Sequence, residues 1–516
     1  MVNDAAKELA NSIFVVVNTT MTVVHDVWHA VPGGSFIWSY IKRSHQNDPF
    51  RTLLEVVVLI FMGWYVLRKK NRAPGQPQKL DLKPHEIQEL IDEWEPEPLV
   101  PPPDDAAKWE LDHIPVLLAS QGLRTKLIDG KQVANFASYN FLGLLNHETI
   151  KEKAIEALHT YGVGTCGPPG FYGTLDVHME LENALAAYVG REHAIIYSQG
   201  FSTISSVIPA FSKRGDILVV DNGVSFAIQQ GVILSRSRVY WFQHNDTADL
   251  ERVLRDIARE ESSPKNRKRL LPRKFIVTEG LFCNSGDVAP LPAICDLSDA
   301  YKYRLILDES FSFGVLGARG RGAAEFWDLD PSRVDIMVGS LCNALAASGG
   351  FCAGSREIVE HQRLSGLSYT FSASLPSLLA VSALEALRIL DHQPELLTTL
   401  QQNIAAVHAV LAKPLEGVTL ETEAAAGDNV SPIIHVRLRE DVYDVEESEV
   451  ILQDAVDAAI REGYVFTRAK YIRSQEIKPP HPSIRLTVSA GFTKKECERA
   501  ATVLRDALRK SLKTKK

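Results

Sequence analysis

The sequence predicts an α/β protein with a largely parallel central sheet, followed by a smaller α+β domain at its C-terminal end. Three observations predict this fold class. Short apolar runs alternate with helical stretches from about residue 130, which is typical of parallel strands covered by helices on both faces. The chain has 516 residues, 45% of them hydrophobic, so it can bury a large core. After a long helix expected at 375–390, the spacing of strands and helices changes.

Six apolar runs are expected to form the central sheet, and three more belong to the C-terminal domain. The central strands are expected at 194–197, 217–220, 239–242, 275–278, 304–307 and 335–338. The C-terminal strands are expected at 433–436, 464–466 and 484–488, around helices at 447–462 and 493–511. We therefore place a large domain at 104–390 and a small domain at 391–516. The basic, proline-containing insertion at 262–274 is expected to be a solvated loop, with contact to lipid headgroups or a partner as the alternative.

Three segments precede the large domain. Residues 1–49 form an amphipathic segment, expected to lie on a membrane or a partner; packing on the protein's own core is the alternative. Residues 50–70 contain an uncharged apolar run at 56–67 and predict one transmembrane helix, with a monotopic anchor as the alternative. Four basic residues follow this run by position 72, so the positive-inside rule places the rest of the chain in the cytosol. Residues 71–103 are expected to hold a helix at 85–94 and an extended proline-rich linker at 95–103.

Charge and cysteine content exclude several classes of function. The formal net charge of -8 gives no electrostatic basis for nucleic-acid binding. The six cysteines include no CxxC pair and no zinc-finger spacing, so no metal site is predicted. Such sparse cysteines fit reduced thiols in a protein that faces the cytosol.

The functional prediction depends on the run from Val338 to Gly350, Val-Gly-Ser-Leu-Cys-Asn-Ala-Leu-Ala-Ala-Ser-Gly-Gly. This run resembles the cofactor-lysine segment of the α-oxoamine synthases, which are pyridoxal-phosphate (PLP) enzymes with the fold-type I, aminotransferase-like fold. In active members a lysine a short step before the paired glycines forms the Schiff base, and Asn343 stands in that place here. An amide cannot form that bond, and no lysine occurs between 338 and 354. The chain is therefore similar to the first, non-catalytic long-chain-base subunits of serine palmitoyltransferase.

Other positions of the family's cofactor site are partly kept. Asp308 matches the carboxylate that the resemblance assigns to the pyridine nitrogen, although an acid at a strand end is also a common loop ligand. Ser225 and Phe311 stand where the family carries histidines. Residues 198–203 join a strand to a helix N-terminus, where an ordinary helix cap is favoured over a phosphate site. The resemblance thus implies that this chain has no catalytic residue and holds no cofactor of its own.

Two segments keep the family pattern. The first, residues 161–174, is called here the glycine loop and contains Cys166, Gly167, Phe171 and Tyr172. The resemblance places this loop at the subunit interface beside the partner's active site. Many members carry arginine where Pro169 stands, so a role for charge there is not carried over. Cys166 is expected to be a buried, inert cysteine, with a reactive thiol as the alternative.

The second segment is the run Phe-Ser-Ala-Ser-Leu-Pro at 371–376, called here the serine segment. In active homodimers of the family, a hydroxyl residue of such a segment reaches the PLP phosphate of the other subunit. Ser372 and Ser374 match it. The alternative is that Ser374 caps the helix that begins near Pro376.

Taken with the family, these features imply a subunit of serine palmitoyltransferase, a PLP-dependent acyltransferase that condenses L-serine with palmitoyl-CoA to 3-ketosphinganine in sphingolipid synthesis. A homologous catalytic subunit would bind PLP covalently, and this chain alone would be inactive. The resemblance also implies a single-pass protein of the endoplasmic reticulum membrane, with its globular domain in the cytosol and with small membrane regulatory subunits and membrane lipid as further partners. The alternative is a membrane-tethered scaffold or lipid-sensing regulator that contributes nothing to catalysis.

Overall fold

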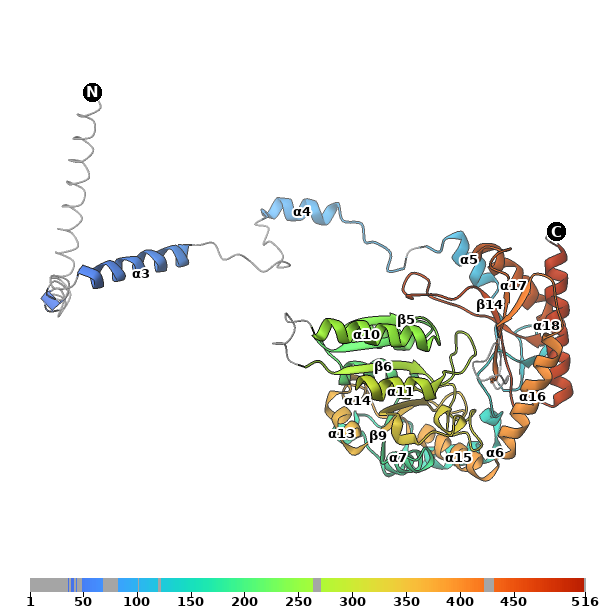
Figure 1. Cartoon of the computed structure of the whole chain (residues 1–516). Helices are drawn as coiled ribbons and strands as arrows, with labels where there is room; N and C mark the ends of the chain where they lie inside the picture. The colour runs from blue at the N-terminus through green and yellow to red at the C-terminus, as the bar shows by residue number, and fades with distance from the viewer. Residues whose placement is uncertain are drawn as a thin grey trace. The chain divides into compact units, whose positions relative to one another are not determined.

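A computed structural model describes residues 36, 39–40, 43, 49–67, 82–100, 102–118, 122–262, 271–421 and 431–514. The chain divides into two compact units, Met1–Pro102 and Pro103–Lys516 (Figure 1). The amphipathic helix predicted within the first 49 residues, and most of the insertion at 262–274, lie outside the described residues.

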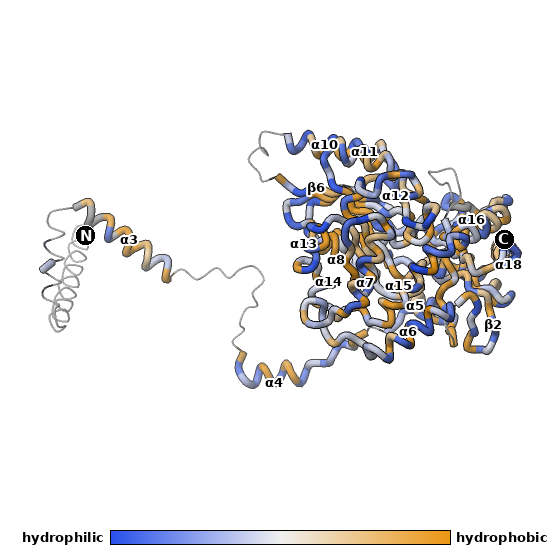
Figure 2. The backbone as a smooth tube through the Cα atoms, turned by 90° about the horizontal axis from the view of Figure 1, so that it is seen from below, coloured by the Kyte–Doolittle hydropathy of each residue, from blue (hydrophilic) through white to orange (hydrophobic). Residues whose placement is uncertain are grey.

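The first unit contains two described helices, α3 (Pro49–Leu67) and α4 (Pro84–Asp92). Helix α3 covers the apolar run of the sequence and is hydrophobic along most of its length (Figure 2). No helix in the described part of the chain has both the length and the apolar character of a membrane span. The transmembrane helix predicted at 50–70 is therefore not shown. Helix α4 starts at a proline, which suits the first helical position, and ends before the proline-rich linker.

The second unit is built on a seven-stranded mixed sheet in the order β3-β9-β8-β7-β6-β4-β5. Its strands are β3 (His193–Tyr197), β4 (Ile217–Asp221), β5 (Arg238–Phe242), β6 (Lys274–Glu279), β7 (Arg304–Asp308), β8 (Ile336–Ser340) and β9 (Gly350–Gly354). All six predicted strands are present. Strand β9 was not predicted, and it runs antiparallel to β3 and β8. The chain reverses there through Gly349, which has φ +99° and whose added Cβ would lie 2.5 Å from the Tyr197 carbonyl oxygen.

Helices cover this sheet and bury most residues of its strands, except on the edge strand β5, where four of the five residues are half-buried. Helices α8 and α9 pack on each other, and α15 packs on α6 and α7 (Figure 1). The helices around the sheet are α6 (Glu148–Tyr161), α7 (Asp176–Tyr188), α8 (Gly200–Phe211), α9 (Phe226–Ser235), α10 (Thr247–Ser262), α11 (Leu291–Tyr301), α12 (Ala323–Phe326), α13 (Arg356–Ser365), α14 (Leu367–Thr370) and α15 (Ser377–His392). Strand β4 shows the result, since all five of its residues are buried.

The C-terminal region forms the predicted α+β structure. Strands β10 (Val418–Glu421), β11 (Ile433–Leu438), β13 (Thr467–Arg468) and β14 (Ser483–Thr487) form an antiparallel sheet in the order β10-β11-β14-β13. Helices α16 (Glu395–Leu411), α17 (Val445–Arg461) and α18 (Lys494–Thr514) accompany this sheet. The predicted strands and helices of this region are confirmed, and α16, β10 and β13 are additions.

One small sheet joins distant parts of the sequence. Strands β1 (Arg124–Lys126) and β2 (Gln132–Asn135) pair with each other, and β2 pairs in parallel with β12 (Tyr464–Val465). Helix α5 (Asp105–Asp112) also reaches the C-terminal region, where Glu110 pairs with Arg468 and Lys470. The start of the predicted large domain therefore packs with the C-terminal domain.

Candidate functional site

A cavity of about 410 Å³ opens at the carboxyl ends of β7 and β8. Parallel strands of α/β sheets bring ligand-binding residues to this edge. Asp308, Phe311 and Asn343 line one side of the cavity, together with Ser225 from the start of α9. Residues of the C-terminal region, including Arg485, close the other side. The fold thus brings together the four positions at which the sequence was compared with a PLP site.

Asn343 is held by backbone contacts on the cavity wall. Its side-chain Nδ2 donates a hydrogen bond to the Ser310 carbonyl oxygen at 2.8 Å. Its own carbonyl oxygen accepts from the Phe141 N–H at 3.4 Å. The side-chain amide of Asn343 therefore connects the loop after β8 to the loop after β7. This structural role does not require an amine.

Asp308 lies beside a second buried carboxyl group, Glu279, which the sequence analysis missed. The two residues end neighbouring parallel strands and are paired in register. Asp308 accepts a hydrogen bond from the Ser310 N–H at 2.8 Å, and Glu279 accepts one from the Ser225 N–H at 2.5 Å. The sequence did carry a signal for Glu279, because this acidic residue directly follows the predicted strand that precedes the strand of Asp308.

Burial controls the protonation of this carboxyl pair. Desolvation is the main cause that raises the pKa of both Glu279 and Asp308, and the charge of Asp308 raises the pKa of Glu279 further. Hydrogen bonds from backbone N–H groups oppose the shift without cancelling it. The pair consequently holds protons more strongly than ordinary carboxyl groups.

An Asp-His-Asp cluster fixes the loops that carry the cavity wall. His244 Nδ1 lies 2.8 Å from Asp221 Oδ1, and His244 Nε2 lies 3.0 Å from Asp287 Oδ2. Burial opposes the charge on His244, but its hydrogen bonds to both aspartates raise its pKa to about 10. The charged imidazole therefore joins the loop that precedes Ser225 to the loop that follows Cys283.

Ser225 and Phe311 occupy the cavity without supplying an imidazole. Ser225 precedes α9 and contributes its backbone N–H to Glu279. The ring of Phe311 packs edge-on against Tyr139, with ring centres 5.0 Å apart. The Arg485 guanidinium lies over the Tyr139 ring, 4.1 Å from its centre. At the two positions where the family carries histidines, the wall thus presents a hydroxyl and a phenyl group, while His435 of β11 lines another part of the cavity.

These residues do not fit a covalently held PLP. Asn343 has no amine. Among the described residues that line the cavity, the lysine that could supply one is Lys470. The Nζ atom of Lys470 pairs with Glu110 of α5, and its side chain is 54% exposed. The segment at 198–203 begins α8 at Gly200, and the ordinary helix cap predicted there is wrong as far as side chains are concerned, because Gln199 makes no capping hydrogen bond. The Thr203 hydroxyl donates instead to the Gln199 carbonyl oxygen at 2.6 Å.

The glycine loop and the serine segment lie against each other, and neither lines this cavity. The Ser374 N–H donates to the Gly167 carbonyl oxygen at 3.0 Å, and the Thr165 hydroxyl donates to the Ser374 carbonyl oxygen at 3.2 Å. The hydroxyl groups of Ser372 and Ser198 are 3.2 Å apart. Two segments more than 190 residues apart in sequence therefore form one continuous edge of the molecule.

One expectation and one alternative for this edge are wrong. Cys166 is exposed, whereas a buried cysteine was expected; it lies in a glycine-rich surface loop, where its backbone is left-handed (φ +53°). Ser374 does not cap the following helix, since α15 begins at Ser377 without a side-chain capping bond. Its hydroxyl lies 3.4 Å from the Gly167 carbonyl oxygen instead. Phe171 and Tyr172 are 68% and 100% exposed.

The fold and the cavity define a protein of the aminotransferase-like, PLP-dependent transferase class, and the aminotransferase class I and II family matches residues 131–504. The chain is 41% identical to serine palmitoyltransferase 1 of Dictyostelium discoideum, over 86% of this chain and 91% of that protein. It is 37% identical to serine palmitoyltransferase 1 of Saccharomyces cerevisiae, over 93% and 92% of the two chains. A solved serine palmitoyltransferase with a PLP internal aldimine superposes with a TM-score of 0.68 at 25% identity, covering 78% of this chain and 96% of that one. The chain belongs to the serine palmitoyltransferase 1 family.

Proposed function

We propose that this chain is the non-catalytic subunit of a serine palmitoyltransferase. The complex condenses L-serine with palmitoyl-CoA to 3-ketosphinganine, the first step of sphingolipid synthesis. The observation that carries the proposal is Asn343, which replaces the cofactor lysine in an otherwise well-formed cavity and is bonded to the Ser310 carbonyl oxygen. The family names support the same function, since relatives at about 40% identity are serine palmitoyltransferase 1 proteins.

The cofactor belongs to a homologous catalytic subunit in this proposal. PLP bound there supplies the electron sink for loss of the serine carboxylate and formation of the new carbon–carbon bond. This chain contributes binding and shape, because its own cavity offers no amine and no imidazole at the cofactor positions. The joined edge of glycine loop and serine segment carries the exposed Phe171 and Tyr172 that such a partner would cover.

Each residue predicted at the interface has a distinct part on this edge. Gly167 and Ser374 hold the two segments together, so they orient the surface without needing to touch substrate. Ser372 already lies 3.2 Å from the Ser198 hydroxyl of its own chain, and it must turn from this contact to reach a group on the partner. Exposed Cys166 is free of such bonds to side chains in the described residues and can contact the partner directly.

We further propose that the complex sits on the endoplasmic reticulum membrane, with the globular unit in the cytosol. Support comes from the apolar helix α3, whose described side chains such as Ile60 (66%) and Leu67 (84%) are exposed. Basic residues at 68–70 follow it directly and favour the cytosolic side. Small membrane subunits and membrane lipid are natural partners of the same helix. Protease protection and alkaline extraction of the full chain from microsomes distinguish a spanning α3 from one that lies at the surface.

The alternative function is a tethered scaffold or lipid-sensing regulator without any part in catalysis. Under that alternative, changes at Cys166 and Ser372 leave the partner's kinetics and substrate preference unaltered while the complex stays assembled. Under the proposed function, they change the partner's kinetic constants.

The deciding experiment is expression of the full chain alone and together with its candidate catalytic subunit. We expect no PLP absorbance, no borohydride-reducible imine and no condensing activity from the chain alone, and all three from the co-purified complex. A reducible imine and serine turnover in the chain alone would contradict the proposal.

A further inference from the structure

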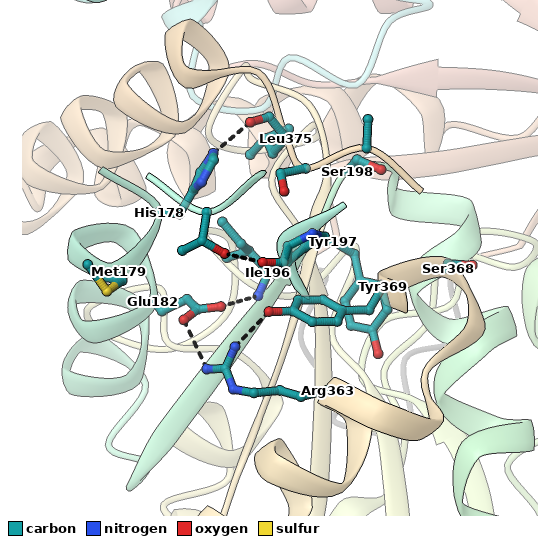
Figure 3. Close-up of a pocket in the computed structure, with 14 residues that line it drawn as sticks. His178, Met179, Glu182, Ile196, Tyr197, Ser198, Arg363, Ser368, Tyr369 and Leu375 are labelled. Atoms are coloured by element: carbon teal, nitrogen blue, oxygen red, sulfur yellow. Dashed lines mark hydrogen bonds and ion pairs between the residues drawn. The ribbon is translucent and has the colours of Figure 1, made fainter. Parts of the chain in front are cut away.

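A second cavity, of about 170 Å³, lies directly beneath the edge formed by the glycine loop and the serine segment (Figure 3). Pro169 and Thr174 of the glycine loop line one lip, and Ala373 and Leu375 of the serine segment line the other. The floor comes from α7, β3 and the helices α13 and α14. This cavity shares no lining residue with the larger one at the ends of β7 and β8.

The polar groups around this cavity are already bonded to one another. Glu182 pairs with Arg363 at 3.2 Å and accepts from the Ile196 N–H at 3.1 Å. Arg363 also donates to the Tyr369 hydroxyl at 2.7 Å (Figure 3). These three side chains are engaged with one another, and most of the surface that lines the cavity is apolar. The cavity therefore suits an apolar group.

His178 joins the two lips. Its Nε2 donates to the Leu375 carbonyl oxygen at 2.6 Å (Figure 3), and its Nδ1 accepts from the Leu175 N–H at 3.0 Å. Leu175 directly follows the glycine loop, and Leu375 lies in the serine segment. Both bonds together require the neutral ring with its proton on Nε2. Burial lowers the pKa of His178, which favours that neutral form.

Large exposed side chains lie on the two segments that form the lips and on α7. Tyr172 of the glycine loop is fully exposed and has a left-handed backbone (φ +66°). Phe371 of the serine segment is 80% exposed, and Met179 of α7, which lines the cavity, is 52% exposed. Exposed aromatic groups around an apolar hole are typical of the centre of a protein–protein interface. This surface continues the edge to which the proposed function assigns the partner.

We propose that this cavity is a socket for an apolar side chain of the catalytic subunit, and that His178 is a positioning residue that sets the spacing of its two lips. The inference rests on the proposed function, since it names the point at which the partner docks. A partner side chain in the socket would bury the exposed aromatic groups. The spacing of the two lips would then fix the position of the partner's active-site wall relative to this chain.

The first test fills the socket from one lip. Ala373→Leu places a larger side chain in the 170 Å³ cavity. Ala324→Leu is the matched control, because it fills a cavity of similar size, about 160 Å³, lined by residues of α12 and by Arg191. With the full chain in detergent or nanodiscs, we expect Ala373→Leu to weaken binding of the catalytic subunit about tenfold or more. Ala324→Leu should leave the dissociation constant unchanged.

The second test separates positioning from stability. His178→Gln can keep the donor to Leu375, whereas His178→Ala loses both bonds. We expect His178→Ala to weaken partner binding about tenfold and His178→Gln to recover part of the loss. The kcat per assembled complex should stay close to that of the wild type. A fall in thermal stability of the chain without any change in partner affinity would show a purely structural role and overturn the assignment.

The third test identifies the occupant. A photo-crosslinking residue at Met179, in the purified complex, should link this chain to a peptide of the catalytic subunit. Linkage to a lipid or acyl chain, or no linkage in a complex that is otherwise assembled, overturns the socket. Failure of the proposed function looks different: the wild-type chain itself would then bind no catalytic subunit. That result does not depend on any of these variants.

Discussion

The two cavities of the globular unit differ in what surrounds them. The larger one, at the ends of β7 and β8, is lined by Asp308, which lies beside a second buried carboxyl group, Glu279, and burial raises the proton affinity of both. The smaller one, beneath the glycine loop, has bonded polar groups and a rim of exposed aromatic side chains. The first corresponds to the family's cofactor site and has Asn343 where the lysine would stand, and the second lies on the edge that the proposed function assigns to the partner. Under the proposed function, the difference teaches that this chain contributes through its edge and not through a cofactor of its own.

The largest expected effect on this comparison comes from Gly173. A Cβ there would lie 2.1 Å from the Gly167 carbonyl oxygen and 2.7 Å from the Pro168 carbonyl oxygen, so the backbone must move. We expect Gly173→Ala to separate the glycine loop from the serine segment and to weaken partner binding by about 3 kcal/mol, roughly a hundredfold. Gly170→Ala is the control, because nothing lies within 4 Å of its Cβ. Equal affinities of the two variants, measured on full-length chains, would show that the edge does not depend on this close approach.

A smaller effect is expected from the exposed aromatic rim. Tyr172→Ala removes a fully exposed side chain, so the free energy of unfolding of the isolated chain should change little. Partner binding should weaken by about 2 kcal/mol if Tyr172 lies near the centre of the interface. Ile155→Ala on α6, where the side chain is 56% exposed, serves as control and should leave binding unaltered. Loss of stability in place of affinity would argue against an interface role for this rim.

The sequence predicted the strands well, because six buried apolar runs needed only local patterns to be recognised. It did not predict β9, because the paired glycines Gly349 and Gly350 match the family's cofactor segment. In the structure the chain reverses at these glycines and enters an antiparallel strand. The pairing of β2 with β12 was also missed, because it joins residues more than 300 positions apart. Such pairings depend on the folded context, which a single sequence does not show.

The candidate site divides in the same way. Asp308, Ser225, Phe311 and Asn343 were found from motifs, and the fold brings all four to one cavity. Glu279 was missed because its meaning comes from its register beside Asp308. His178 was missed because its role depends on Leu375, a residue 197 positions away. The burial of Cys166 was predicted wrongly, since residue type alone does not report the exposed surface loop in which it lies.

The carboxyl pair gives a prediction of moderate size. Because burial raises the pKa of Asp308 and Glu279, the folded chain keeps protons that the unfolded chain has released above the ordinary carboxyl pKa of about 4. Stability should therefore fall as the pH rises from that value through the raised pKa values. We expect Asp308→Asn to lessen this fall and to stabilise the chain at pH 8 by about 1–2 kcal/mol. Denaturant unfolding of both proteins at pH 5.5 and pH 8 measures it, and parallel pH dependences of the two would contradict it.

The smallest expected effect is at Asn343 itself. If this residue is only structural, its contribution is the hydrogen bond to the Ser310 carbonyl oxygen, worth about 1 kcal/mol. Asn343→Ala should lower the stability of the chain by about that amount, while kcat and KM of the assembled complex stay within about twofold of the wild type. Asn343→Gln is the matched control for loss of this hydrogen bond, because it keeps the amide on a longer side chain. A large loss of activity in an assembled Asn343→Ala complex would mean that this cavity still acts in catalysis. The proposed division, in which this chain contributes through its edge and not through this cavity, would then be wrong.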